Sequence, residues 1–128
     1  MKLLLDTHIW LWLFEAPERL GTAAAKALRT DENELWLSPI STWEALTLEH
    51  KGRIKVSGDV SNWVARMTAG TQEAPITHEI MLAARLLPLH QDPADRILVA
   101  TAQVLDLVLV TADERLLVLG NIKTLANR

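Results

Sequence analysis

The chain contains no cysteine, which excludes disulfide bonds and thiolate metal ligands and allows, without requiring, a reducing compartment. Long apolar segments are also missing, because the run over residues 9–14 is too short to cross a bilayer and only Lys2 precedes it as a positive charge. We therefore expect neither a signal peptide nor a membrane anchor, and a cytoplasmic location. The net charge of −3 argues against a protein that holds polyanions on a basic surface. Any contact with nucleic acid has to be local or pass through a bound cation.

Internal repeats, low-complexity tracts and linkers are absent as well, so we expect a single domain over residues 1–128. The hydrophobic share of 49% and the charged share of 23% are typical of a globular protein. Short apolar or strand-like segments alternate with helical patterns, and the segments expected to be strands are residues 3–5, 35–37, 75–77, 107–110 and 121–125. This alternation predicts an α/β fold, with a mainly parallel central sheet between two layers of helices.

Four carboxylates stand where these strands end or where the following helices begin. They are Asp6, Glu44, Asp95 and Asp113. In a parallel sheet the carboxyl ends of the strands share one edge, and ligands bind there. Each acid also has a structural explanation. Asp6 and Asp113 can cap helices, and Asp95 can occupy the third position of a helix capped by Asp92. Ser41 with Glu44 has the spacing of a capping box that opens a helix over residues 42–50.

Several carboxylates in one cleft repel one another unless a proton or a cation compensates them. Helix N-termini contribute only about 0.3 to 1 kcal/mol each, which is too little to gather four charges. A hard ion such as Mg²⁺ or Mn²⁺ suits carboxylate oxygens, whereas Zn²⁺ prefers close histidines or cysteines and the four histidines here are scattered. An ion of this kind binds phosphate, activates water and stabilises a leaving oxygen, so the predicted reaction is phosphodiester hydrolysis.

Four motifs run through essentially the whole chain. They read Leu-Leu-Asp6-Thr-His-Ile-Trp, Ser-Thr-Trp-Glu44, His90-x-Asp-Pro-x-Asp95-Arg-Ile-Leu-Val-Ala-Thr-Ala and Leu-Val-Thr-Ala-Asp113. In order and spacing they resemble the acidic motifs of PIN-domain proteins, especially VapC-like toxins of bacterial type II toxin–antitoxin pairs. The resemblance implies a PIN-like fold, a Mg²⁺- or Mn²⁺-dependent endoribonuclease, a homodimer, and an antitoxin that inhibits by covering the site.

The resemblance also implies roles for individual residues. The catalytic and metal-binding set would be Asp6, Glu44, Asp95 and Asp113. Within it, Asp6 and Asp95 would be the direct ligands, and Thr111 would orient a water or a substrate phosphate. Ala94 departs from the family pattern, which commonly has a bulky aromatic residue between the proline and the catalytic aspartate.

Neighbouring polar residues have two explanations each. We expect Asp92 to cap a helix with Pro93 at its first position, and the alternative is that it contacts the metal ion. His90 could form a hydrogen bond near the site or be a surface residue. Arg96 could bind a substrate phosphate or a carboxylate, or be a solvated helix arginine. The basic residues Lys51, Arg53 and Lys55, with Arg19, could steer RNA or be merely solvated.

Trp10 and Trp12 point to different faces of one predicted helix over residues 8–15, so both cannot easily enter the same core. We therefore expect a partner-binding surface there, for an antitoxin or a second copy.

Two other functions stay open for the chain as a whole. One is a non-catalytic acidic α/β interaction module whose acids only cap helices. The other is a phosphatase or phosphotransfer domain, disfavoured because Asp6 lacks the second aspartate of an Asp-x-Asp pair and no phosphate-binding glycine loop is present.

Overall fold

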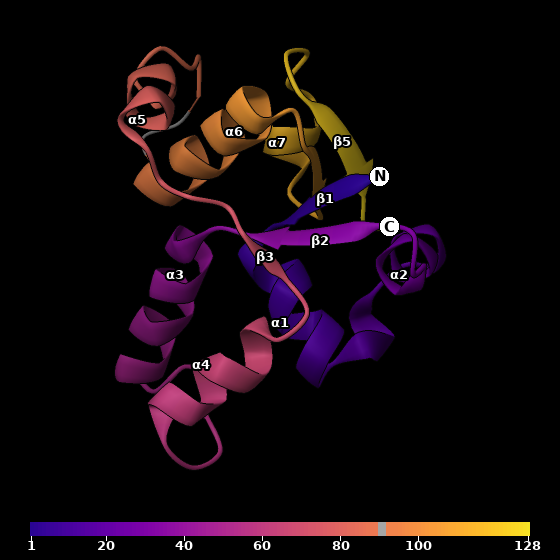
Figure 1. Ribbon diagram of the computed structural model, residues 1–128, viewed down its shortest axis with the longest axis vertical. Helices are drawn as coiled ribbons and strands as arrows, with labels where there is room; N and C mark the ends of the chain where they lie inside the picture. Colours follow the sequence, from indigo (N-terminus) through magenta and orange to yellow (C-terminus); the bar gives the residue numbers. More distant parts are fainter. Residues whose placement is uncertain (90–91) are drawn as a thin grey trace.

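The computed structural model describes residues 1–89 and 92–128, which form three layers with a parallel sheet in the middle (Figure 1). The strands follow the order β3-β2-β1-β4-β5, and their bounds are β1 Lys2–Leu5, β2 Glu34–Leu37, β3 Gln72–Glu73, β4 Val108–Thr111 and β5 Lys123–Ala126. On one face lie α1 (Thr7–Glu15), the 3₁₀ helix η1 (Pro17–Arg19), α2 (Thr22–Arg29), α3 (Pro39–His50) and α4 (Val60–Thr68). On the other face lie α5 (His78–Ala84), α6 (Pro93–Leu105) and α7 (Glu114–Leu117). The predicted fold class is confirmed.

The central strand β1 explains why three consecutive leucines open the chain. Successive side chains of a strand point to opposite faces. Leu3 and Leu5 accordingly pack in the core that contains Trp10, and Leu4 packs in the core that contains Leu98. All three leucines are fully buried, so β1 is covered by helices on both sides.

The topology places a ligand-binding edge between β1 and β4. From β1 the chain builds the sheet outward through β2 and β3, and it then returns to pair β4 with the other side of β1. The helix after β1 packs on one face of the sheet and the helix after β4 on the other, which defines a topological switch point. Asp6 directly follows β1, and its backbone N–H donates to the carbonyl of Val110 in β4 at 3.0 Å.

Two sequence predictions about boundaries are wrong. The helix expected over residues 42–50 begins at Pro39, because the Ser38 hydroxyl accepts from the N–H of Ile40 and proline suits the first helical position. Ser41 is therefore a buried residue inside α3 and not the cap of a capping box. The strand expected at residues 75–77 instead forms at Gln72–Glu73. Just after it, the N–H of Ala74 still donates a hydrogen bond to the carbonyl of Leu37 in β2. The next residue, Pro75, has no N–H to continue it.

The remaining strands agree with the sequence patterns to within one or two residues. The run at 107–110 is β4, and the edge strand expected at 121–125 is β5. The longest helix, α6, has 13 residues. Over residues 1–89 and 92–128, no helix has the length and apolar character needed to span a bilayer.

Candidate active site

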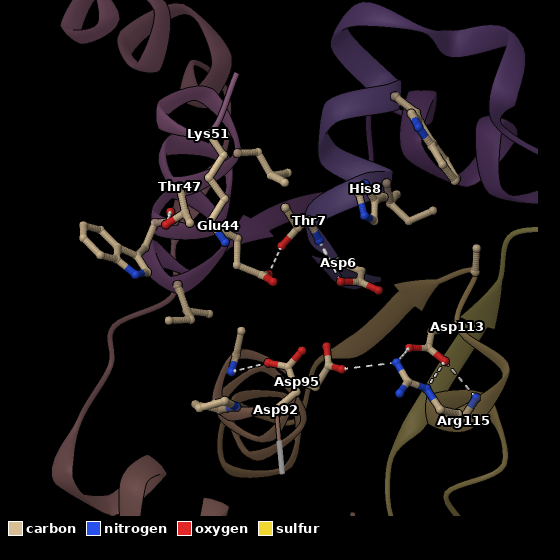
Figure 2. Close-up of a pocket in the computed structure, with 18 residues that line it drawn as sticks. Asp6, Thr7, His8, Glu44, Thr47, Lys51, Asp92, Asp95, Asp113 and Arg115 are labelled. Carbon is tan, nitrogen blue, oxygen red and sulfur yellow. Dashed lines mark hydrogen bonds and ion pairs between the residues drawn. The ribbon is translucent and has the colours of Figure 1, made fainter. Parts of the chain in front are cut away.

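A cleft of about 670 Å³ lies at the carboxyl edge of the sheet, where α1, α3, α6 and α7 begin or pass (Figure 2). Five acidic residues line it: Asp6, Glu44, Asp92, Asp95 and Asp113. They come from four separate parts of the chain and meet only through the fold. The expectation that the four motif acids lie together is confirmed, whereas their chemical roles stay predictions.

Asp6 is held from both sides at the switch point. It is the N-cap of α1, where its Oδ1 accepts from the N–H of Thr7 at 2.8 Å, and its Oδ2 accepts from the Thr111 hydroxyl at 2.6 Å. Burial raises the pKa of Asp6 above its ordinary value and the charge of Asp95 adds to the rise, while the two hydrogen bonds and His8 oppose it. The carboxylate is fixed in place, and its negative charge is only partly compensated.

Glu44 reaches the cleft from the middle of α3. Its Oε1 accepts a hydrogen bond from the hydroxyl of Thr7, the residue after Asp6. Burial raises the pKa of Glu44, and the charges of Asp6, Asp95 and Asp92 raise it further, against the effect of the Thr7 bond. The acids that the sequence separates by dozens of residues therefore interact electrostatically in the folded chain.

The start of α6 supplies two more acids. Asp92 is the N-cap, with its Oδ1 accepting from the N–H of Ala94 at 3.0 Å, and Pro93 occupies the first turn, so the predicted cap is confirmed. Asp95 follows on the same turn, and only 13% of its side chain is exposed. His90, which the sequence placed near this site, lies outside the described residues.

Asp113 caps α7 and is paired with Arg115. Its Oδ1 accepts from the backbone N–H of Arg115 at 2.9 Å and from Nε at 3.1 Å, and its Oδ2 is 2.8 Å from Nη2. The same Nη2 lies 3.7 Å from Asp95 Oδ2 (Figure 2). These bonds raise the pKa of the Arg115 guanidinium, so a fixed positive charge stands at this side of the cleft.

The donor chemistry of the cleft fits a hard divalent cation. All its acidic side chains offer carboxylate oxygens, which are the ligands of Mg²⁺ and Mn²⁺. The pKa values of Asp6 and Glu44 are raised first by burial and then by neighbouring carboxylates, and a bound cation would counter both effects. Among residues 1–89 and 92–128, no three acidic or histidine side chains are close enough to hold one ion in this arrangement. Within that part of the chain, at least one of these side chains has to move before three can share an ion.

Three of the other candidate residues lie in different surroundings from those the sequence suggested. Thr111 is fully buried and its hydroxyl donates to Asp6, so it positions a carboxylate and has no exposed surface for substrate. Arg96 does not line the cleft; it donates to the backbone carbonyls of Leu89 and Arg85 and ties α6 to the segment before it. Trp10 is fully buried with its Nε1 donating to the Met67 carbonyl at 2.7 Å, so the expected partner contact is wrong for it.

Trp12 does reach the cleft and stays a candidate for partner binding. Its ring stacks on His8 with centroids 5.8 Å apart, and the Arg19 guanidinium lies 5.6 Å from the ring centroid. Thr7 and Arg115 also belong to the site, although the sequence patterns did not indicate them. The signal for both was proximity, since each stands one or two positions after an acid at the start of a helix.

The fold and the acidic cleft together define a known class of proteins. The model of the PIN domain family matches residues 3–121, and the chain belongs to that family.

Similar proteins narrow the class. The chain is 35% identical over 115 residues to ribonuclease VapC22 of Mycobacterium tuberculosis, a match that covers 88% of each protein. Its fold resembles VapBC2 from Rickettsia felis, solved bound to a promoter DNA fragment, with a TM-score of 0.74, 14% identity and full coverage of both chains. It also resembles VapBC-1 from nontypeable Haemophilus influenzae, with a TM-score of 0.68, 16% identity and 98% of each chain covered. The chain is thus similar to VapC-type proteins over nearly its whole length.

Proposed function

We propose that this chain is a Mg²⁺- or Mn²⁺-dependent endoribonuclease and the toxin of a toxin–antitoxin pair. The observation that carries the proposal is the meeting of Asp6, Glu44, Asp95 and Asp113 in one cleft at the switch point of the sheet. The similarity to a protein named as a ribonuclease, at 35% identity, supports RNA as the substrate. The resemblance of the fold to toxin–antitoxin complexes is consistent with the biological role.

In this proposal Asp6 and Asp95 hold the metal ion, and Glu44 and Asp113 complete the acidic set around it. When bound, such an ion lowers the pKa of a water and stabilises the leaving oxygen of an in-line displacement at phosphorus. The chain itself supplies positioning: the Thr111 hydroxyl fixes Asp6, and the Thr7 hydroxyl fixes Glu44. Lys51 lines the same cleft and suits a phosphate of the bound RNA.

The proposal extends to the partners. A cognate antitoxin inhibits the enzyme by covering the cleft, and the toxin is a cytoplasmic homodimer. Trp43, which is 66% exposed, and Trp12 both line the cleft and provide apolar surface for such a partner. The chain also shares its overall fold with chains solved as toxin–antitoxin complexes, and this similarity supports a protein partner.

Cleavage of a pool of cellular RNAs by the purified protein tests the function. We expect cleavage with Mg²⁺ or Mn²⁺, none with a chelator, and none with Asp95→Asn. Asp106→Asn is the matched control, because Asp106 pairs with Lys123 on the surface and does not line the cleft. Cleavage that persists in the presence of chelator and in Asp95→Asn would contradict the proposal.

The interaction module is a second candidate, favoured by one observation: Asp6, Asp92 and Asp113 are all N-caps in the folded chain. Thermal unfolding with and without Mn²⁺ distinguishes the two functions. A metal site predicts a higher unfolding temperature with Mn²⁺ for the wild-type chain and a smaller change for Asp95→Asn. Acids that only cap helices predict no change in either protein.

A further inference from the structure

Arg115 lies between two acids of the cleft. One nitrogen of its guanidinium, Nη2, is 2.8 Å from Asp113 Oδ2 and 3.7 Å from Asp95 Oδ2. A cation that the two carboxylates shared would stand in the same place. The position of a second ion is therefore taken by a side chain of the protein.

We infer that Arg115 supplies the positive charge on the Asp113 side of the cleft, so that the site takes one divalent ion, on the Asp6 and Asp95 side, and not two. The inference rests on the proposed metal-dependent function and adds to it the number of ions and the residue that sets this number. Both oxygens of Asp113 accept N–H donors of Arg115, two of them at Oδ1, so an ion at Asp113 would have to lie beside the positive guanidinium, which repels it.

The opposite side of the cleft is held differently. Asp6 accepts one backbone N–H and one hydroxyl, and Glu44 accepts a hydroxyl, so neutral donors hold both carboxylates. A divalent ion gains more free energy beside carboxylates whose charge is uncompensated than beside one already paired with a guanidinium. The guanidinium stays charged at every pH at which the protein folds, so this asymmetry is permanent.

The number of Mn²⁺ ions bound by the full chain, counted by electron paramagnetic resonance titration, tests the inference. The wild-type chain binds one ion and Arg115→Gln binds two, because the guanidinium that lies against Asp113 is then gone. Arg115→Lys keeps the charge and binds one. Asp113→Asn also binds one, since Asp113 does not hold the ion of the wild-type site.

Arg128→Gln is the matched control for net charge. Arg128 pairs with Glu114 at 3.0 Å, both side chains are about two-thirds exposed, and neither lines the cleft. This variant binds one ion. Thermal unfolding of each metal-free variant verifies that it is folded before the titration.

Several results would overturn the inference. They are one ion in Arg115→Gln, two ions in the wild-type chain, and two ions in Arg128→Gln, which would assign the effect to net charge and not to position. All of these leave the proposed metal site intact. No Mn²⁺ bound by the wild-type chain would remove the metal site itself, so the two failures are distinguishable.

Discussion

The two sides of the acidic cleft hold the same kind of side chain in different ways. On the first side, Asp6 and Glu44 are partly buried and accept hydrogen bonds from neutral donors, and their pKa values are raised. On the second side, Asp113 forms a two-point ion pair with Arg115, which also faces Asp95. Burial beside neutral donors makes the first side the place where a metal ion would be most favoured, because it would offset charges that burial and the neighbouring acids disfavour. On the second side the guanidinium already offsets the charge of Asp113 before any ion binds.

Capping a helix and lining the cleft are therefore not alternatives for these acids. Asp6 and Asp113 both cap helices that begin at the carboxyl edge of the sheet, and both line the cleft. Helix N-termini favour negative charge, which lowers the cost of placing carboxylates there. What separates the two acids is their surroundings and not their caps.

Asp6→Asn gives the largest expected effect. We expect RNA cleavage to fall about 100-fold or more, as when a group that stabilises the transition state is removed. The metal-free chain keeps its stability, because asparagine also caps helices well and the uncompensated charge is gone. Cleavage rates and thermal unfolding measure the two effects. If Asp113→Asn cost as much activity as Asp6→Asn, the contrast between the two sides would be wrong.

Thr111→Val comes next. The substitution removes the hydroxyl that donates to Asp6 and accepts from the N–H of Asp113, so we expect Mn²⁺ affinity to fall about 10- to 100-fold, as for other residues that orient metal ligands. Titration with Mn²⁺ measures the effect. Thr101→Val is the matched control, because Thr101 is equally buried and its hydroxyl donates to the Ile97 carbonyl within α6. An equal loss of affinity in Thr101→Val would show that Thr111 acts only through stability.

Thr7→Val probes the buried side more gently. The Thr7 hydroxyl lowers the pKa of Glu44, so its removal should raise that pKa further in the metal-free chain. Carboxyl chemical shifts of Glu44, followed by NMR during a pH titration, measure it. Thr47→Val is the control. Thr47 lines the cleft from α3, the helix that carries Glu44, but its hydroxyl donates to the Trp43 carbonyl and not to Glu44. An unchanged or lower pKa in Thr7→Val would mean that the hydroxyl does not hold Glu44.

The sequence predicted the sheet and the meeting of the acids because both follow from patterns along the chain. Apolar runs mark β1 and β4. In a parallel sheet the carboxyl ends of these strands must share an edge, so the sequence predicted that Asp6 and Asp113 lie close together. The start of α3 was missed because Ser41 and Glu44 imitate a capping box, while Ser38 and Pro39 provide the actual cap. Local spacing alone could not decide between two adjacent caps.

Contacts between distant parts of the chain were harder to predict from the sequence. Nothing local indicates that Trp10 fills the core while Trp12, two residues later, lines the cleft, since this depends on where α4 packs against α1. Arg115 was missed because an arginine in the first turn of a helix is ordinarily solvated. Its role depends on the acid that α6 brings to within 3.7 Å of it.

The smallest expected effect is on the pH dependence of stability. Because the pKa values of Asp6 and Glu44 are raised in the folded chain, the native state binds more protons than the unfolded state between the ordinary carboxyl values and the raised ones. The contribution of these two groups to the free energy of unfolding then decreases as pH rises through this interval. Above the interval their contribution is constant. Other carboxylates titrate in the same range, so the informative quantity is the difference between wild type and Asp6→Asn, measured by chemical denaturation without metal.

That difference has a definite sign. Wild-type stability should fall relative to Asp6→Asn as pH rises from about 4, because the variant lacks one of the two carboxyl groups whose pKa values are raised by folding and keeps only Glu44. Adding Mn²⁺ should reverse the trend, since the ion binds the ionised carboxylates and binds them better as protons leave. The same comparison with Asp113→Asn should show no such fall, because Arg115 already compensates that charge. A matching fall for Asp113 would mean that the guanidinium does not neutralise its side, and the two halves of the cleft would then be electrostatically alike.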